Sequence, residues 1–118
     1  MYRTLMFIPA LLLAGCALLA GQTPQSTVFA AESTYGAALK VAVVYESLPR
    51  CVDMGPVLCS DTEVVAVLRS AATTAKTALE HAENVVRTPG VPDDVALTAV
   101  VTATEAAKAF STIANQYK

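Results

Sequence analysis

Few side chains in this sequence combine the types and spacing that catalysis or metal binding requires. His81 is the only histidine, and it falls next to Glu80 and close to Glu83 in a segment with helical periodicity. Solvation of a helix face explains that carboxylate pair, and negative charge at a helix start explains Asp93-Asp94. The chain has no H-E-x-x-H, no Gly-rich phosphate loop and no G-x-S-x-G. Without a partnered base its Ser and Thr hydroxyls are not nucleophiles, so we expect no enzyme, no metal site and no cofactor.

Four threonines recur at a spacing of four residues on the expected outer faces of two helical segments. They are Thr73, Thr77, Thr98 and Thr102. A binding strip and a neutral polar surface are the two interpretations, and we favour the polar surface. The formal net charge is −2, with no block of like charge, so we expect no nucleic-acid partner, because such a partner requires a basic stripe.

The first residues have the organisation of a secretory signal. Arg3 precedes an apolar run from Leu5 to Leu12, and small residues follow it. A membrane-spanning helix is a weaker interpretation, because the whole apolar stretch is shorter than the roughly 20 residues required and contains Pro9. Cleavage after Ala30 is a second alternative, since Val28-Phe29-Ala30 also suits an ordinary signal peptidase.

Leu13-Ala14-Gly15-Cys16 resembles the lipobox of bacterial lipoproteins. The resemblance implies that residues 1–15 are removed as a signal peptide and that Cys16 receives lipid. It also implies a membrane partner through the lipid anchor. Ala17, where an Asp would be the retention signal in two-membrane bacteria, implies the outer membrane. We expect residues 16–31 to be a lipidated flexible tether, because the stretch from Gly21 to Thr27 is polar and contains Pro.

With Cys16 assigned to lipid, Cys51 and Cys59 remain as a pair. In an exported protein, an even number of remaining cysteines indicates a disulfide. The bridge would clip a short loop that also contains Pro49, Gly55 and Pro56. A redox or metal pair is the alternative, but the C-x7-C spacing and the distant histidine do not favour it.

Three segments with helical periodicity are expected to form helices between residue 32 and the last residue, 118. The first covers about residues 32–48, and Pro49 ends it. A strand over residues 41–45 is the alternative, and we reject it because the sequence offers no second strand candidate to pair with it. The second begins at the capping-box pattern Ser60 to Glu63. The third begins near Pro92. The spacings of three and four fall on these positions: Tyr35, Ala38, Ala42 and Tyr45; Val65, Leu68, Ala72, Ala75, Leu79, Ala82 and Val86; Ala96, Ala99, Ala103, Ala106, Phe110, Ile113 and Tyr117.

The sequence therefore predicts an all-α fold, a three-helix antiparallel bundle with a disulfide-clipped first loop. The segments Tyr45 to Cys51 and Cys59-Ser60-Asp61 also resemble small helical proteins of bacterial prophage regions, a group with no assigned activity. We expect a non-enzymatic envelope lipoprotein, facing the periplasm, that presents a helical surface to a protein partner. The alternative is a small inhibitor or phage exclusion factor acting in the periplasm.

The first helix is apolar on more sides than two neighbouring helices cover. The strip of Val41, Val44 and Leu48 is therefore expected to meet a second copy, giving a homo-oligomer. A protein partner and the membrane surface are the other candidates. A further alternative is that Val28 and Phe29, in the expected tether, fold back over this strip.

Overall fold

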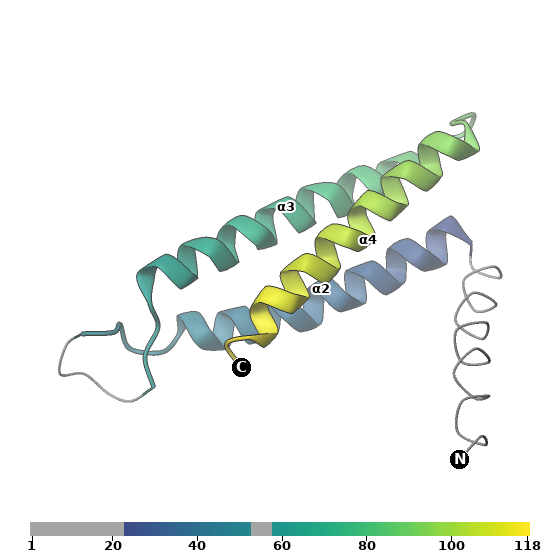
Figure 1. Ribbon diagram of the computed structural model, residues 1–118. Coiled ribbons are helices and arrows are strands. Elements are labelled where there is room, and N and C mark those ends of the chain that lie inside the picture. The colour runs from purple at the N-terminus through teal and green to yellow at the C-terminus, as the bar shows by residue number, and fades with distance from the viewer. Residues whose placement is uncertain (1–22, 53–57) are drawn as a thin grey trace, which may run out of the picture.

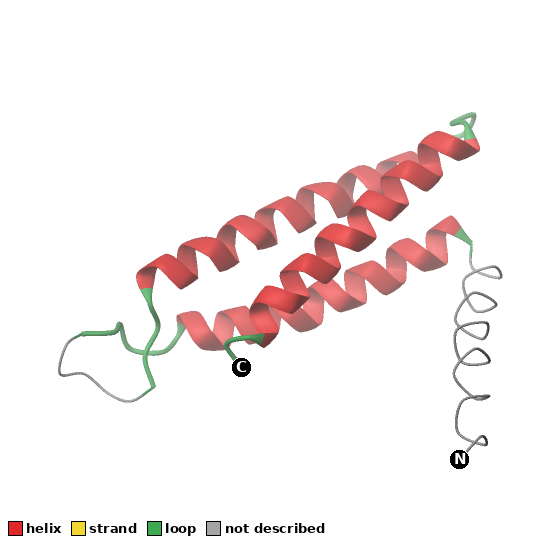
Figure 2. Cartoon of the chain, viewed as in Figure 1, coloured by secondary structure: helices red, strands yellow, loops and turns green. Residues whose placement is uncertain are grey.

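The computed structural model describes residues 23–52 and 58–118. Within these ranges it contains three helices: α2 (Pro24–Glu46), α3 (Thr62–Arg87) and α4 (Asp93–Asn115). Each helix runs antiparallel to the next along the chain, and the C-terminus lies beside the second half of α2 (Figure 1). No strand occurs among the described residues (Figure 2). The predicted all-α, three-helix antiparallel bundle is confirmed. The expected signal peptide and Cys16 lie outside the described residues.

The start of α2 corrects the predicted boundary between tether and bundle. Residues 24–31 are helical, two turns ahead of the expected start at residue 32. Pro24 occupies the first turn, where its missing N–H costs no hydrogen bond. The Thr23 hydroxyl caps the helix by accepting a bond from the Ser26 N–H at 3.2 Å. Burial of Val28 and Ala31, each 4% exposed, then holds these turns against the bundle.

The core consists of two clusters that follow each other along the bundle. One joins the first half of α2 to Leu79 and Ala82 of α3 and to the first half of α4. The other joins the second half of α2 to Leu68 of α3 and Phe110 of α4. Tyr35 contacts both clusters. Most predicted seam positions of α3 and α4 are buried or half-buried, and the many alanines among them allow close helix packing.

The cap of α3 differs from the predicted capping box. Asp61, not Ser60, is the cap residue, and its Oδ1 accepts bonds from the backbone N–H groups of Glu63 at 2.8 Å and Val64 at 3.4 Å. Ser60 is fully buried instead. Its hydroxyl donates to the backbone oxygen of Leu48 at 2.9 Å, which ties the start of α3 to the end of α2.

Candidate functional site

The loop between α2 and α3 is closed at its base by backbone hydrogen bonds around Ser60. The Ser60 N–H donates to the carbonyl of Pro49 at 2.8 Å, and the Ser60 carbonyl accepts from the Cys51 N–H at 3.1 Å. Cys51 and Cys59 form a disulfide directly beside this bridge. The predicted disulfide is confirmed, and with both sulfurs bonded to each other neither is a thiolate ligand. The segment that carries Leu58 and Cys59 is thereby fixed against the end of α2.

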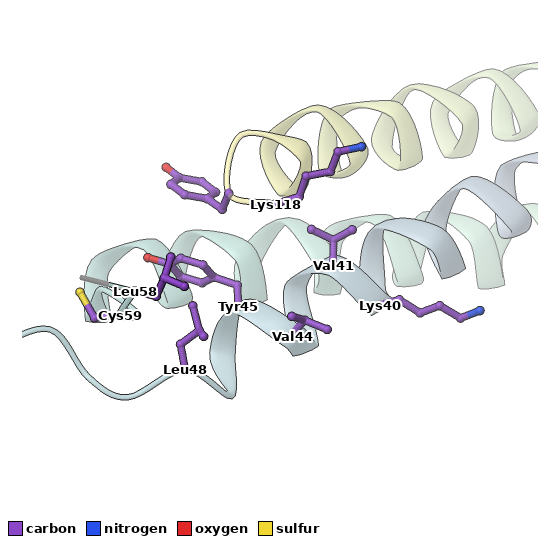
Figure 3. A pocket seen from close by; sticks show the side chains of 9 residues that line it. Lys40, Val41, Val44, Tyr45, Leu48, Leu58, Cys59 and Lys118 are labelled. Carbon is purple, nitrogen blue, oxygen red and sulfur yellow. The ribbon is translucent and has the colours of Figure 1, made fainter. Parts of the chain in front are cut away.

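An apolar groove lies at this end of the bundle. It has a volume of about 520 Å³, and its lining comes from the second half of α2, the end of the loop and the last residues of the chain. Figure 3 shows the aliphatic side chains gathered around the ring of Tyr45. The lining residues are Lys40, Val41, Val44, Tyr45, Leu48, Leu58, Cys59, Tyr117 and Lys118.

Tyr45 forms the base of the groove and is held from two sides. Its hydroxyl oxygen accepts a bond from the Asp61 N–H at 2.9 Å, so the phenol is fixed to the start of α3. Its ring packs against Tyr117 with the ring centroids 5.2 Å apart, a tilted arrangement that aromatic pairs favour. The side chain itself is only 9% exposed. The base of the groove is therefore already ordered in the free chain, which lowers the entropy cost of binding.

The predicted apolar strip lies along this groove. Val44 is 65% exposed, while Val41 and Leu48 are half-buried. Leu58, which no pattern in the sequence indicates, adds a large aliphatic side chain that is 73% exposed. The alternative in which Val28 and Phe29 cover the strip is wrong. Both belong to the first turns of α2, where Val28 is in the core and Phe29 is 73% exposed, at the other end of the helix.

The charges at the groove are unevenly distributed. Lys40 and Lys118 line it, and among the residues that the structure describes no carboxylate side chain does. Glu46, at the end of α2, is engaged by Arg69 of α3, whose Nε lies 3.2 Å from its carboxylate. The hydrogen bond to Glu46, and then its charge, raise the pKa of the Arg69 guanidinium. The groove therefore combines an apolar floor with a positive rim, which favours an apolar segment that carries a carboxylate.

The other residues considered from the sequence do not come together into a site. His81 is exposed on α3. Thr98 and Thr102 donate their hydroxyls to carbonyls one turn back in α4, at 2.8 and 2.9 Å. Among residues 23–52 and 58–118, no group of three or more His, Cys, Asp or Glu side chains is placed to hold a metal ion.

No protein-family model, curated protein or solved structure matches this sequence. In the part of the chain that the structure describes, none of the helices has the length and apolar character to cross a membrane.

Proposed function

We propose that this chain is a small, non-enzymatic envelope lipoprotein that binds a protein partner in the apolar groove. The groove carries the proposal, because large side chains such as Val44 and Leu58 are exposed there around a pre-ordered aromatic base. A partner segment that covers them removes apolar surface from water, worth about 25 cal/mol per Å². The positive rim of Lys40 and Lys118 selects a segment with a carboxylate at one end.

The cellular location follows from the lipobox resemblance at Leu13-Ala14-Gly15-Cys16. In this proposal lipid on Cys16 holds the bundle at a membrane, and Ala17 after the lipidated residue supports the outer membrane, with the bundle facing the periplasm.

Replacing Cys16 with Ala is expected to abolish lipid attachment, because the acceptor thiol is lost. Metabolic labelling with an alkyne fatty acid should mark the parent chain and leave Cys16→Ala unlabelled and out of the membrane fraction. Ala20→Ser serves as the control, since it changes a nearby small residue and keeps the acceptor. Equal labelling and equal membrane attachment of Cys16→Ala and the parent would contradict the anchor.

A photo-crosslinking side chain at Tyr117 is expected to capture the groove's occupant in intact cells. A benzoylphenylalanine there keeps an aromatic ring at the groove. Leu58→Asp in the same chain should reduce the adduct severalfold, because it places an unpaired carboxylate on the apolar lining. The matched control is Val52→Asp, in the same loop, at a residue that is 68% exposed but does not line the groove.

Two results would contradict the partner-protein proposal. One is an adduct that Leu58→Asp and Val52→Asp affect equally, since the contact would then not depend on the groove. The other is an adduct with the mass of two copies of this chain. A crosslinker at Val67, which is 50% exposed on α3, gives the background for a random surface position.

A further inference from the structure

The side of α2 that faces away from α3 and α4 carries a second row of exposed residues, with an apolar side chain at each end, and it shares only Lys40 with the groove. Phe29, Ser33, Gly36, Lys40 and Val43 follow one another at alternating spacings of four and three residues, which places them on one stripe of the helix. We call these five residues the outer stripe of α2. Phe29 is 73% exposed and Val43 is 57% exposed. A helix that is apolar nearly all round, with one side open, lacks a neighbour.

Gly36 lies at the middle of the outer stripe and, within residues 23–52 and 58–118, has no role in packing. A Cβ atom added there would meet nothing within 4 Å. Its backbone is ordinary helix, so the position does not need the conformational freedom of glycine. Glycine inside a helix is less stable than alanine. Close approach of another helix at this point gives a physical reason for the missing side chain.

The outer stripe, together with its neighbour Glu32, is complementary to itself when a second copy runs antiparallel to it. With a two-fold axis at Gly36, each residue lies beside the one equally far on the other side of Gly36 in the second copy. Phe29 then lies beside Val43 of the second copy, apolar against apolar. Lys40, the single charge of the stripe, lies beside Glu32 of the second copy, positive against negative.

We propose that two copies of this chain form an antiparallel dimer through the outer stripe of α2, with the helices closest at Gly36. A parallel pair lacks this complementarity, because it places Lys40 beside Lys40 and Phe29 beside Phe29. Of the stripe residues only Lys40 also lines the groove, and the apolar lining of the groove, such as Val41, Leu48 and Leu58, is not in the stripe. The dimer therefore does not depend on the proposed function.

The test uses the full chain in intact cells and cysteines at the two apolar ends of the stripe. Phe29→Cys and Val43→Cys in one chain are about 21 Å apart along the helix, at 1.5 Å per residue, so they cannot join within one molecule. In the antiparallel dimer each lies beside the other residue of the second copy. The double variant should therefore form a reducible dimer on mild oxidation. Each single variant alone should form little, and the two single variants expressed together should form the mixed dimer.

Adding Gly36→Leu to the double variant should abolish the crosslink, because the leucine side chain keeps the two backbones apart. Leucine also favours the helix more than glycine, so the chain stays folded, which circular dichroism of the purified protein checks. Ala66→Leu, at an exposed position of α3, is the matched control and should leave the crosslink unchanged.

Charge reversal supplies an independent test of the register. Lys40→Glu or Glu32→Lys should each weaken the crosslink severalfold, and the two together should restore it. Single-cysteine variants that crosslink as readily as the double variant would overturn the antiparallel arrangement. A crosslink that persists with Gly36→Leu would overturn the close crossing of the two helices at Gly36.

Discussion

Replacing Phe110 with Asp is expected to unfold the bundle. Phe110 is fully buried in the second core cluster, and its ring packs against Tyr35 with the centroids 5.6 Å apart. Loss of such a ring alone costs about 3–5 kcal/mol, and the unpaired carboxylate adds a desolvation penalty. Together these match or exceed the stability of many small domains, about 5–15 kcal/mol. Far-ultraviolet circular dichroism should show the loss of helix at room temperature.

Leu79→Asp tests the other core cluster in the same way, because Leu79 is 5% exposed between α2 and α4. Thr73→Asp is the control, since Thr73 is exposed on the outer face of α3. It should change the free energy of unfolding by less than about 1 kcal/mol. A thermal melt in which Thr73→Asp lowers the Tm more than Leu79→Asp does would mean that the buried and exposed faces of α3 are assigned wrongly.

Removing the disulfide with Cys51→Ser and Cys59→Ser is expected to lower the free energy of unfolding by about 2–3 kcal/mol. The two cysteines are eight residues apart, and the open loop gains entropy in the unfolded chain. The bundle should still fold, because the bonds of Ser60 to Leu48 and Pro49 close the same loop without the sulfurs. Urea titration followed by circular dichroism measures the difference.

Ser60→Ala in the parent chain separates the two contributions to this loop. It removes one buried hydroxyl and leaves the Leu48 carbonyl without that donor, at a cost of about 1–3 kcal/mol. A double cysteine variant as stable as the parent would contradict the entropic role of the disulfide. Complete unfolding of that variant would show that the hydrogen bonds of Ser60 do not hold the loop alone.

The packing faces of α3 and α4 could be predicted from sequence because their periodicity is regular and long. Leu68, Leu79 and Phe110 recur at helical spacing, and all three are buried. The start of α2 was predicted too late, because the polar residues after Pro24 resemble a linker. The sequence does contain a pattern that indicates the earlier start, because a threonine followed by a proline is typical of a helix cap and first turn. At α3 the local sequence favours Ser60 as the cap, because nothing local indicates that its hydroxyl binds the carbonyl of Leu48, twelve residues away.

The groove could be predicted only in part. Val41, Val44 and Leu48 share one side of a helix, so their periodicity is visible in the sequence. Leu58 and Tyr117 reach the groove from a loop and from the chain end, and no local pattern links them to α2. Their positions depend on the disulfide, on Tyr45 and on how α4 packs, which are properties of the folded chain.

The early start of α2 limits how the bundle can be oriented at a membrane. With lipid on Cys16, as proposed, the chain from Cys16 to Pro24 spans at most about 29 Å when fully extended. In the proposed antiparallel pair the two starts of α2 lie at opposite ends, about 36 Å apart at 1.5 Å per residue. Both anchors then enter one lipid surface most easily when the long axis of the pair lies parallel to it. The pair would then lie flat on the bilayer with one lipid anchor at each end, and this orientation keeps both grooves at a similar height above the lipid.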